Sequence, residues 1–68
     1  MNHFSNNIKR IRYNTGISQE AAAAYYGIGR PRYEALENGR NNPSVDILIL
    51  FSNKLKMSID KLVKTKIR

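Results

Sequence analysis

The stretch QEAAAAYYGIGRPRYEAL, residues 19–36, decides how this chain folds. Its four consecutive alanines favour a helix, because alanine has the highest helix propensity, and Gly27 is suited to end that helix. A second helix is expected to begin near Pro31, since proline is tolerated in a first turn, where its missing N–H would have no partner. Ala23 then lies where the two helices cross, with Gly27 at the turn between them. The spacing predicts two short helices packed across each other at a sharp turn.

The hydrophobic residues of this stretch fall on one shared inner face. They are Ala22, Tyr26, Ile28, Tyr33 and Leu36. Together with the small residue at the crossing and the glycine at the turn, they form the pattern of a helix-turn-helix. Because proline disfavours helical angles in the residue before it, we expect Arg30 to cap the second of these helices. Tyr26 is expected in the core, whereas a role of Tyr25 in base stacking stays open.

Further helices are expected on both sides of this stretch. Residues 5–14 carry a single apolar stripe, which predicts a first helix that ends at Gly16. Serines at the first positions of three expected helices can cap them: Ser18, Ser44 and Ser58. The chain is therefore predicted to be all-α, one compact five-helix domain over residues 1–68. Its core spans about residues 5–63, and the basic tail 64–68 is expected to fray.

The composition excludes several classes of protein and indicates one class of partner. The 68 residues include 12 Lys and Arg against 5 Asp and Glu, a net charge of +7, and no cysteine. Without cysteine there is no disulfide or thiolate zinc site, and His3 has no second ligand nearby, so no metal is expected. There is no run of about 18 apolar residues and no start like a signal peptide, so we expect no membrane segment. A charge of this sign favours a polyanionic partner, such as nucleic acid or an anionic lipid surface.

Catalysis is not expected. The sequence contains no nucleophile–base pair, no paired carboxylates and no glycine loop that could cradle a phosphate. We therefore expect neither an enzyme nor a cofactor.

Several short motifs stand at fixed positions along the chain. They are Arg12, Gly16-Ile17-Ser18-Gln19-Glu20, Gly27-Ile28, Leu36-Glu37-Asn38-Gly39-Arg40, Asn42-Pro43-Ser44 and Met57-Ser58-Ile59-Asp60. With this combination, over about residues 8–63, the chain resembles the Xre and Cro type of phage-repressor helix-turn-helix proteins. The resemblance implies a lambda-repressor-like fold and a prokaryotic transcriptional regulator, in particular a repressor, that binds double-stranded DNA in the cytoplasm at the nucleoid. The third helix, residues 30–38, would enter the major groove of a palindromic operator.

The resemblance also implies roles for individual residues. Base contacts would come from Arg30, Pro31, Ala35, Glu34 and Gly29, and phosphate contacts from Gln19, Arg32, Asn38, Arg40 and Asn42. Arg12 and Glu37 match a partly buried ion pair that joins the first helix to the end of the third. Three positions depart from the family pattern: Gly29 replaces a Ser or Thr cap, Pro31 replaces a small polar residue, and Ala35 replaces a long polar side chain. Direct readout is therefore expected to rest mostly on Arg30, whose guanidinium can bind both acceptors of a guanine.

The apolar run at residues 47–51 predicts a surface for contact with another protein chain. One buried face of the fourth helix would take Leu48, Phe51 and Leu55, which leaves Ile47 and Leu50 on a second face. We therefore expect a homodimer through the fourth and fifth helices. Its contacts would come from Ile47, Leu50, Lys54 and Ile67.

Three alternatives to these expectations remain open. The run 47–51 could be a wide core stripe in a monomer. The same fold could serve as a protein-binding adaptor, such as the antitoxin of a toxin–antitoxin pair or a controller protein, and then bind an unrelated protein partner. Charge alone could also support non-specific binding to RNA or to a membrane surface.

Overall fold

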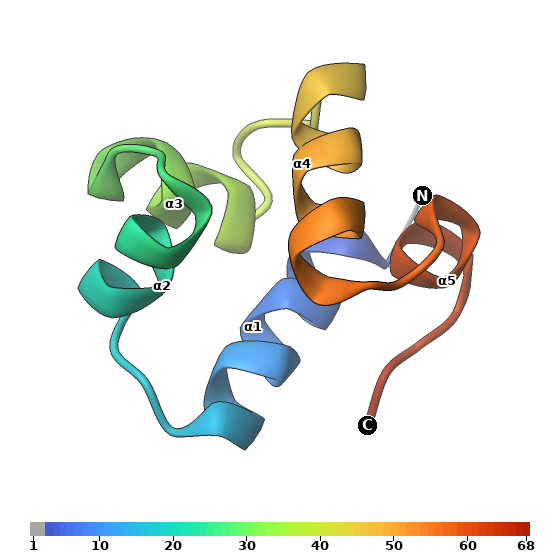
Figure 1. Ribbon diagram of the computed structural model, residues 1–68, viewed down its shortest axis with the longest axis horizontal. Coiled ribbons are helices and arrows are strands. Elements are labelled where there is room, and N and C mark those ends of the chain that lie inside the picture. Colours follow the sequence, from blue (N-terminus) through green and yellow to red (C-terminus); the bar gives the residue numbers. More distant parts are fainter. Residues whose placement is uncertain (1–2) are drawn as a thin grey trace.

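The computed structural model describes residues 3–68, and within them the chain forms five α-helices and no strand. The helices are α1 (Phe4–Thr15), α2 (Gln19–Tyr26), α3 (Arg30–Glu37), α4 (Val45–Leu55) and α5 (Ile59–Lys64). Figure 1 shows α2 and α3 on one side of the molecule and α4 and α5 on the other, with α1 running between the two pairs. The predicted all-α, five-helix architecture is confirmed. Among residues 3–68, none of the helices has the length and apolar character needed to span a membrane.

Serine hydroxyls begin α2, α4 and α5, as predicted. Each accepts the backbone N–H three positions further on, at 3.1 Å for Ser18, 3.3 Å for Ser44 and 3.1 Å for Ser58. The start of α3 differs from the prediction, because Gly29 is its extended N-cap and Arg30 is already helical. The expectation that Arg30 caps α3 is wrong. Proline only biases the residue before it, and the extended angles fall one position earlier, on a glycine that adopts them freely.

Left-handed residues end the first four helices. They are Gly16, Gly27, Gly39 and Lys56, with φ angles of 74°, 72°, 77° and 55°. The residue after each of them donates its backbone N–H to the carbonyl five positions earlier. This bond satisfies a carbonyl of the last helical turn that has no partner within the helix. The donor and acceptor pairs are Ile17 to Arg12, Ile28 to Ala23, Arg40 to Ala35 and Met57 to Ser52. Lys56 is the only non-glycine residue with a positive φ in residues 3–68.

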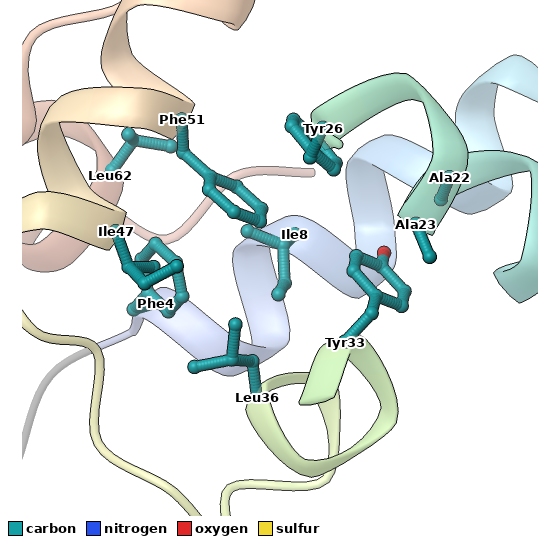
Figure 2. Close-up of a cluster of buried hydrophobic side chains, with 10 residues drawn as sticks. All are labelled: Phe4, Ile8, Ala22, Ala23, Tyr26, Tyr33, Leu36, Ile47, Phe51 and Leu62. Carbon is teal, nitrogen blue, oxygen red and sulfur yellow. The ribbon is translucent and has the colours of Figure 1, made fainter. Parts of the chain in front are cut away.

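All five helices contribute to the core, which is built around aromatic rings (Figure 2). The ring of Tyr26 stacks on Phe51 at 3.8 Å between centroids and on Tyr33 at 6.0 Å, while Phe4 meets Phe51 edge-on. Ala23 is buried between α2 and α3, where a larger side chain would hold the two helices apart. The predicted inner face is confirmed, with Ile28 half-buried at its edge, and Tyr25 is exposed.

The buried face of α4 differs from the predicted one. Ile47 is 3% exposed and Phe51 is fully buried, whereas Leu48, Leu50 and Leu55 are half-buried. The expectation that Ile47 lies on an outer face is wrong: Figure 2 shows it against Phe4 of α1. The stripe follows positions four apart, so the helix is rotated relative to the predicted face. The alternative of a core stripe therefore describes Ile47 correctly.

The C-terminal segment after α5 is held against α1 by one buried side chain. Asn7 of α1 is 1% exposed. Its Nδ2 donates to the carbonyls of Leu62 and Thr65, both at 2.7 Å, and its Oδ1 accepts the N–H of Ile67 at 2.9 Å. In the tail, which was expected to fray, the Thr65 carbonyl and the Ile67 N–H thus both have a partner in the Asn7 amide on the inner face of α1.

Candidate nucleic-acid interface

The exposed face of α3 carries the residues expected to meet DNA bases. Tyr33, Leu36 and Glu37 are buried and fix α3 against α1 and α2. The opposite side of the helix and its N-terminus carry the five expected base-contacting residues. Gly29, Arg30 and Pro31 are exposed there, and Glu34 and Ala35 are half-buried. The helix therefore presents a short surface around its first turn, where a glycine and a proline leave the backbone accessible.

Arg30 lies near two carboxylates. Its Nη1 is 3.8 Å from a carboxylate oxygen of Glu20 on α2, and its Nε is 3.9 Å from one of Glu34 on α3. The Arg30 side chain is 54% exposed and that of Glu20 is 79% exposed. Ion pairs at this exposure are weak, so the guanidinium is held loosely and can exchange these partners for a ligand.

Three of the residues expected to contact phosphates surround one polar hollow beside α3. Arg32, Arg40 and Asn42 line it, together with Ser44, the residue that caps α4. The N-terminus of α4 therefore opens beside two arginines, and its unpaired N–H groups and positive dipole end favour an anion there. Asn38 is exposed at the end of α3, next to Gly39. The structure thus brings Arg32, Arg40 and Asn42 together, but it does not place Gln19 with them.

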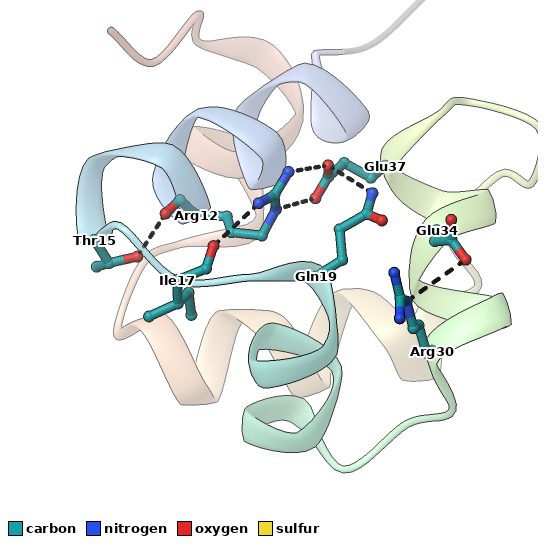
Figure 3. A network of polar contacts seen from close by, with 7 residues as sticks. All are labelled: Arg12, Thr15, Ile17, Gln19, Arg30, Glu34 and Glu37. Atoms are coloured by element: carbon teal, nitrogen blue, oxygen red, sulfur yellow. Dashed lines mark hydrogen bonds and ion pairs between the residues drawn. The ribbon is translucent and has the colours of Figure 1, made fainter.

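Gln19 belongs instead to a polar network that ties three helices together (Figure 3). Arg12 of α1 makes two hydrogen bonds to Glu37 at the end of α3, at 2.9 Å from Nε and 2.8 Å from Nη2. Nε2 of Gln19, the first residue of α2, donates to the same carboxylate at 3.2 Å. A further Arg12 N–H reaches the carbonyl of Ile17 at 3.0 Å. The sequence indicates the Arg12–Glu37 pair, but only the fold reveals that Gln19 joins it.

The network changes the acid–base properties of its members. Burial by itself would raise the pKa of Glu37, whose side chain is 1% exposed, but hydrogen bonds from Arg12 and Gln19 and the Arg12 charge outweigh it. The pKa of Glu37 therefore lies below its ordinary value, and the hydrogen bonds to Glu37 raise the pKa of Arg12. Both groups stay charged at neutral pH.

The Tyr33 hydroxyl is buried near this network. It makes no hydrogen bond of normal geometry within residues 3–68. Burial first, and then the nearby Glu37 carboxylate, raise the pKa of Tyr33. Tyr33 therefore stays neutral while it anchors α3.

The residues expected at a dimer contact have different surroundings. Ile47 is in the core, Leu50 and Ile67 are half-buried, and Lys54 is exposed. The backbone carbonyl of Lys54 accepts a hydrogen bond from the Tyr25 hydroxyl at 3.0 Å. The Nζ atom of Lys54 lies 5.4 Å from the centroid of the Tyr25 ring, so both contacts connect α2 to the end of α4. Sequence reasoning missed the large apolar side chains that α4 does expose. They are Val45, 69% exposed, and Ile49, 46% exposed.

Comparisons with known proteins show the family of the chain. The family described as Helix-turn-helix matches residues 8–62. A curated relative from Bacillus subtilis, the uncharacterized HTH-type transcriptional regulator YqaE, is 41% identical over 61 residues, which cover 90% of this chain and 53% of that protein. A second relative from the same organism, the SPbeta prophage-derived uncharacterized HTH-type transcriptional regulator YonR, is 36% identical over 61 residues, covering 90% and 56%.

The chain spans about half the length of these two curated relatives. No solved structure matches it significantly. The family match extends from the core residue Ile8 to the core residue Leu62, so it covers all of α2 and α3 and the loop that follows. This chain therefore belongs to the Xre and Cro type of helix-turn-helix family, a family of DNA-binding transcriptional regulators.

Proposed function

We propose that this chain binds double-stranded DNA sequence-specifically, with α3 in the major groove, and acts as a transcriptional repressor. The observation that carries the proposal is the division of α3 into two sides. Its buried side is fixed by Tyr33 and Leu36, and its outer side carries Arg30, Pro31 and Arg32 at the surface. A rigidly held helix that exposes arginines at its N-terminal end is suited to read base edges, as in the docking geometry of this motif.

Roles on the DNA follow from position and chemistry. Arg30 would bind a guanine edge, with Pro31 and Ala35 against neighbouring bases and Gly29 and Glu34 at the rim of the contact. Arg32, Arg40 and Asn42 would hold phosphates around the hollow at the start of α4, and Asn38 would contact the backbone after α3. Gln19 remains a candidate phosphate contact because only one of its two amide hydrogens is needed for Glu37.

We further propose that two copies act together on a palindromic operator. The Cα atoms of the chain extend 25 Å along the longest axis, whereas half-sites one helical turn apart are centred about 34 Å from each other. One copy is too small to reach both half-sites. Val45 and Ile49 lie four positions apart on α4 and are exposed, which favours α4 as the contact, together with Leu50 and Lys54. Ile67, half-buried beside α1, is a weaker candidate.

The test of the function is selection of bound duplexes from a random pool. We expect a palindromic consensus with half-sites one helical turn apart. Recovery of duplexes without any shared sequence would contradict sequence-specific binding. A consensus with only one half-site would contradict the two-copy operator but leave the reading by α3 standing.

A second candidate function is a protein-binding adaptor on the same fold, such as an antitoxin or a controller protein. The exposed Val45 and Ile49 favour it, because they could contact an unrelated chain instead of a second copy. Dependence of DNA affinity on a copurifying partner would support this candidate. Full affinity of the purified chain alone would argue against it.

A further inference from the structure

The excess positive charge of the chain is not concentrated at α3. Arg30 lies near the carboxylates of Glu20 and Glu34, which offset two of the three positive charges that Arg30, Arg32 and Arg40 bring to this region. Arg12 is neutralised by Glu37. The region that would meet bases therefore holds a surplus of one positive charge, although the whole chain carries +7. Most of the surplus lies on other surfaces.

One of these surfaces is a hollow between α1 and the segment that follows α5, which we call the α1 groove. The side chains around it include Asn6, Lys9, Arg10, Tyr13, Lys66 and Ile67. No acidic residue lines it. Lys9, Arg10 and Lys66 are exposed, and none of them forms an ion pair within residues 3–68.

Hydrogen bonds from two asparagine side chains of α1 to the backbone after α5 hold the α1 groove in shape. Asn7 holds Thr65 and Ile67 against α1, and Nδ2 of Asn14 donates to the carbonyl of Arg68 at 3.2 Å. These bonds fix one wall of the groove, which carries Lys66. The other wall is a single face of α1, because Asn6, Arg10 and Tyr13 recur three and four positions apart. The backbone that carries these cations is therefore already in place, and only their side chains need to be ordered when an anion enters.

The α1 groove also lies away from the face that would read bases. Figure 1 shows α3 and the C-terminal segment on opposite sides of α1. A duplex seated on α3 would therefore leave the groove uncovered.

We propose that the α1 groove binds the sugar–phosphate backbone of a second DNA duplex, so that one chain can bridge two DNA segments. The inference rests on the proposed function in taking DNA as the ligand of α3. Lys9, Arg10 and Lys66 pair with phosphates, and the amide of Asn6 and the hydroxyl of Tyr13 are further donors. Charge complementarity favours this occupant, because a groove with cations and no carboxylate suits a row of phosphates.

The same surface is poorly suited to an apolar protein partner. Lys9, Arg10 and Lys66 would be covered there without a counter-charge. Tyr13 is exposed beside them, and the Arg12 guanidinium lies 4.7 Å from its ring centroid. An acidic protein segment is therefore left as an outcome of the test.

The test is a capture experiment at low salt with the full chain. One duplex that carries the selected sequence is immobilised and saturated with protein, and capture of a labelled duplex of unrelated sequence is measured. The variant R10A/K66A removes two charges from the α1 groove, and K61A/K64A removes two exposed charges from α5 as a matched control. We expect R10A/K66A to reduce capture of the second duplex about tenfold, since the loss of two phosphate contacts is large at low salt. The control should change it much less.

The readouts separate this proposal from the function assigned to α3. Equal capture by R10A/K66A and by the unmodified chain would overturn it, and so would an equal loss in the control, which would reveal an effect of net charge alone. Tighter, groove-dependent binding of a polyglutamate peptide than of the labelled duplex would also overturn it. Affinity for the immobilised selected duplex is measured in parallel. If that affinity is absent while R10A/K66A still weakens binding of the labelled duplex, the result contradicts base reading by α3 and supports DNA binding by the α1 groove.

Discussion

Glu37, at the end of α3, stabilises the contacts among three helices. Its carboxylate receives hydrogen bonds from Arg12 and Gln19, so one buried charge connects α1, α2 and α3. We predict that Glu37→Gln lowers the free energy of unfolding by about 3 kcal/mol, because it leaves the partly buried guanidinium of Arg12 without a counter-charge. Urea denaturation measures this loss. Glu34→Gln, at an exposed pair, is the control and should cost less than about 0.5 kcal/mol.

The same network predicts the acid response of the protein. Because the pKa of Glu37 is lower in the folded chain than its ordinary value, its contribution to stability is complete above the unfolded pKa. That contribution is lost as the pH falls from about 4.5 through the lower folded value. Glu37→Gln should remove this part of the pH dependence. An unchanged acid transition in the variant would refute the assignment.

At the scale of single helices, α3 is expected to separate positioning from reading. Arg40→Ala should weaken binding to every DNA sequence and reduce the slope of log affinity against log salt by about one, because one phosphate contact is lost. Arg30→Ala should relax preference at one base position, with a loss of about 1–3 kcal/mol on the preferred base. Binding titrations on the selected operator and its single-base variants distinguish the two. Equal losses for Arg30→Ala on all sequences would exclude Arg30 as a reader.

The end of α4 contains a strain that a substitution can relieve. Lys56 holds a left-handed conformation, which glycine adopts at the ends of α1 and α2 and after α3. We predict that Lys56→Gly stabilises the chain by about 0.5–1 kcal/mol, the left-handed penalty less the added entropy of the unfolded state. Lys61→Gly, inside α5, should instead destabilise by about 1 kcal/mol. Thermal unfolding of both variants provides the measurement, and a destabilised Lys56→Gly would contradict the prediction.

Helix positions were predictable from the sequence to the extent that local chemistry sets them. Serine caps, the left-handed glycines and the inner face of residues 19–36 depend on near neighbours, and the structure agrees with those predictions. The rotation of α4 about its axis depends on how the helix packs against Phe4 of α1. No local sequence pattern reveals this packing, so the prediction for Ile47 was wrong. The link from Gln19 to Glu37 spans 18 residues and likewise depends on how α2 and α3 cross.

At the scale of the whole molecule, α4 offers the surface through which two copies would associate. We predict that the chain sediments as a dimer at tens of micromolar, in the range where a weak but specific contact is populated. Ile49→Glu should shift it to a monomer, because a carboxylate would enter an apolar contact. Ala21→Glu, which adds the same charge at an exposed position of α2, should leave the dimer intact. A monomeric unmodified chain at this concentration would refute the two-copy proposal.

The bonds of Asn7 also concern how the chain folds. They join residues 55, 58 and 60 positions apart, nearly the full length of the chain. Contacts between residues so far apart in the sequence require a large loop to close. The contact between α1 and the segment after α5 therefore cannot form from local interactions alone. We expect the Ile67 amide to exchange with solvent hydrogen only at the rate of global unfolding, and native-state hydrogen exchange measures it. On the ribosome, α1 can then acquire its final partners only after Ile67 has emerged.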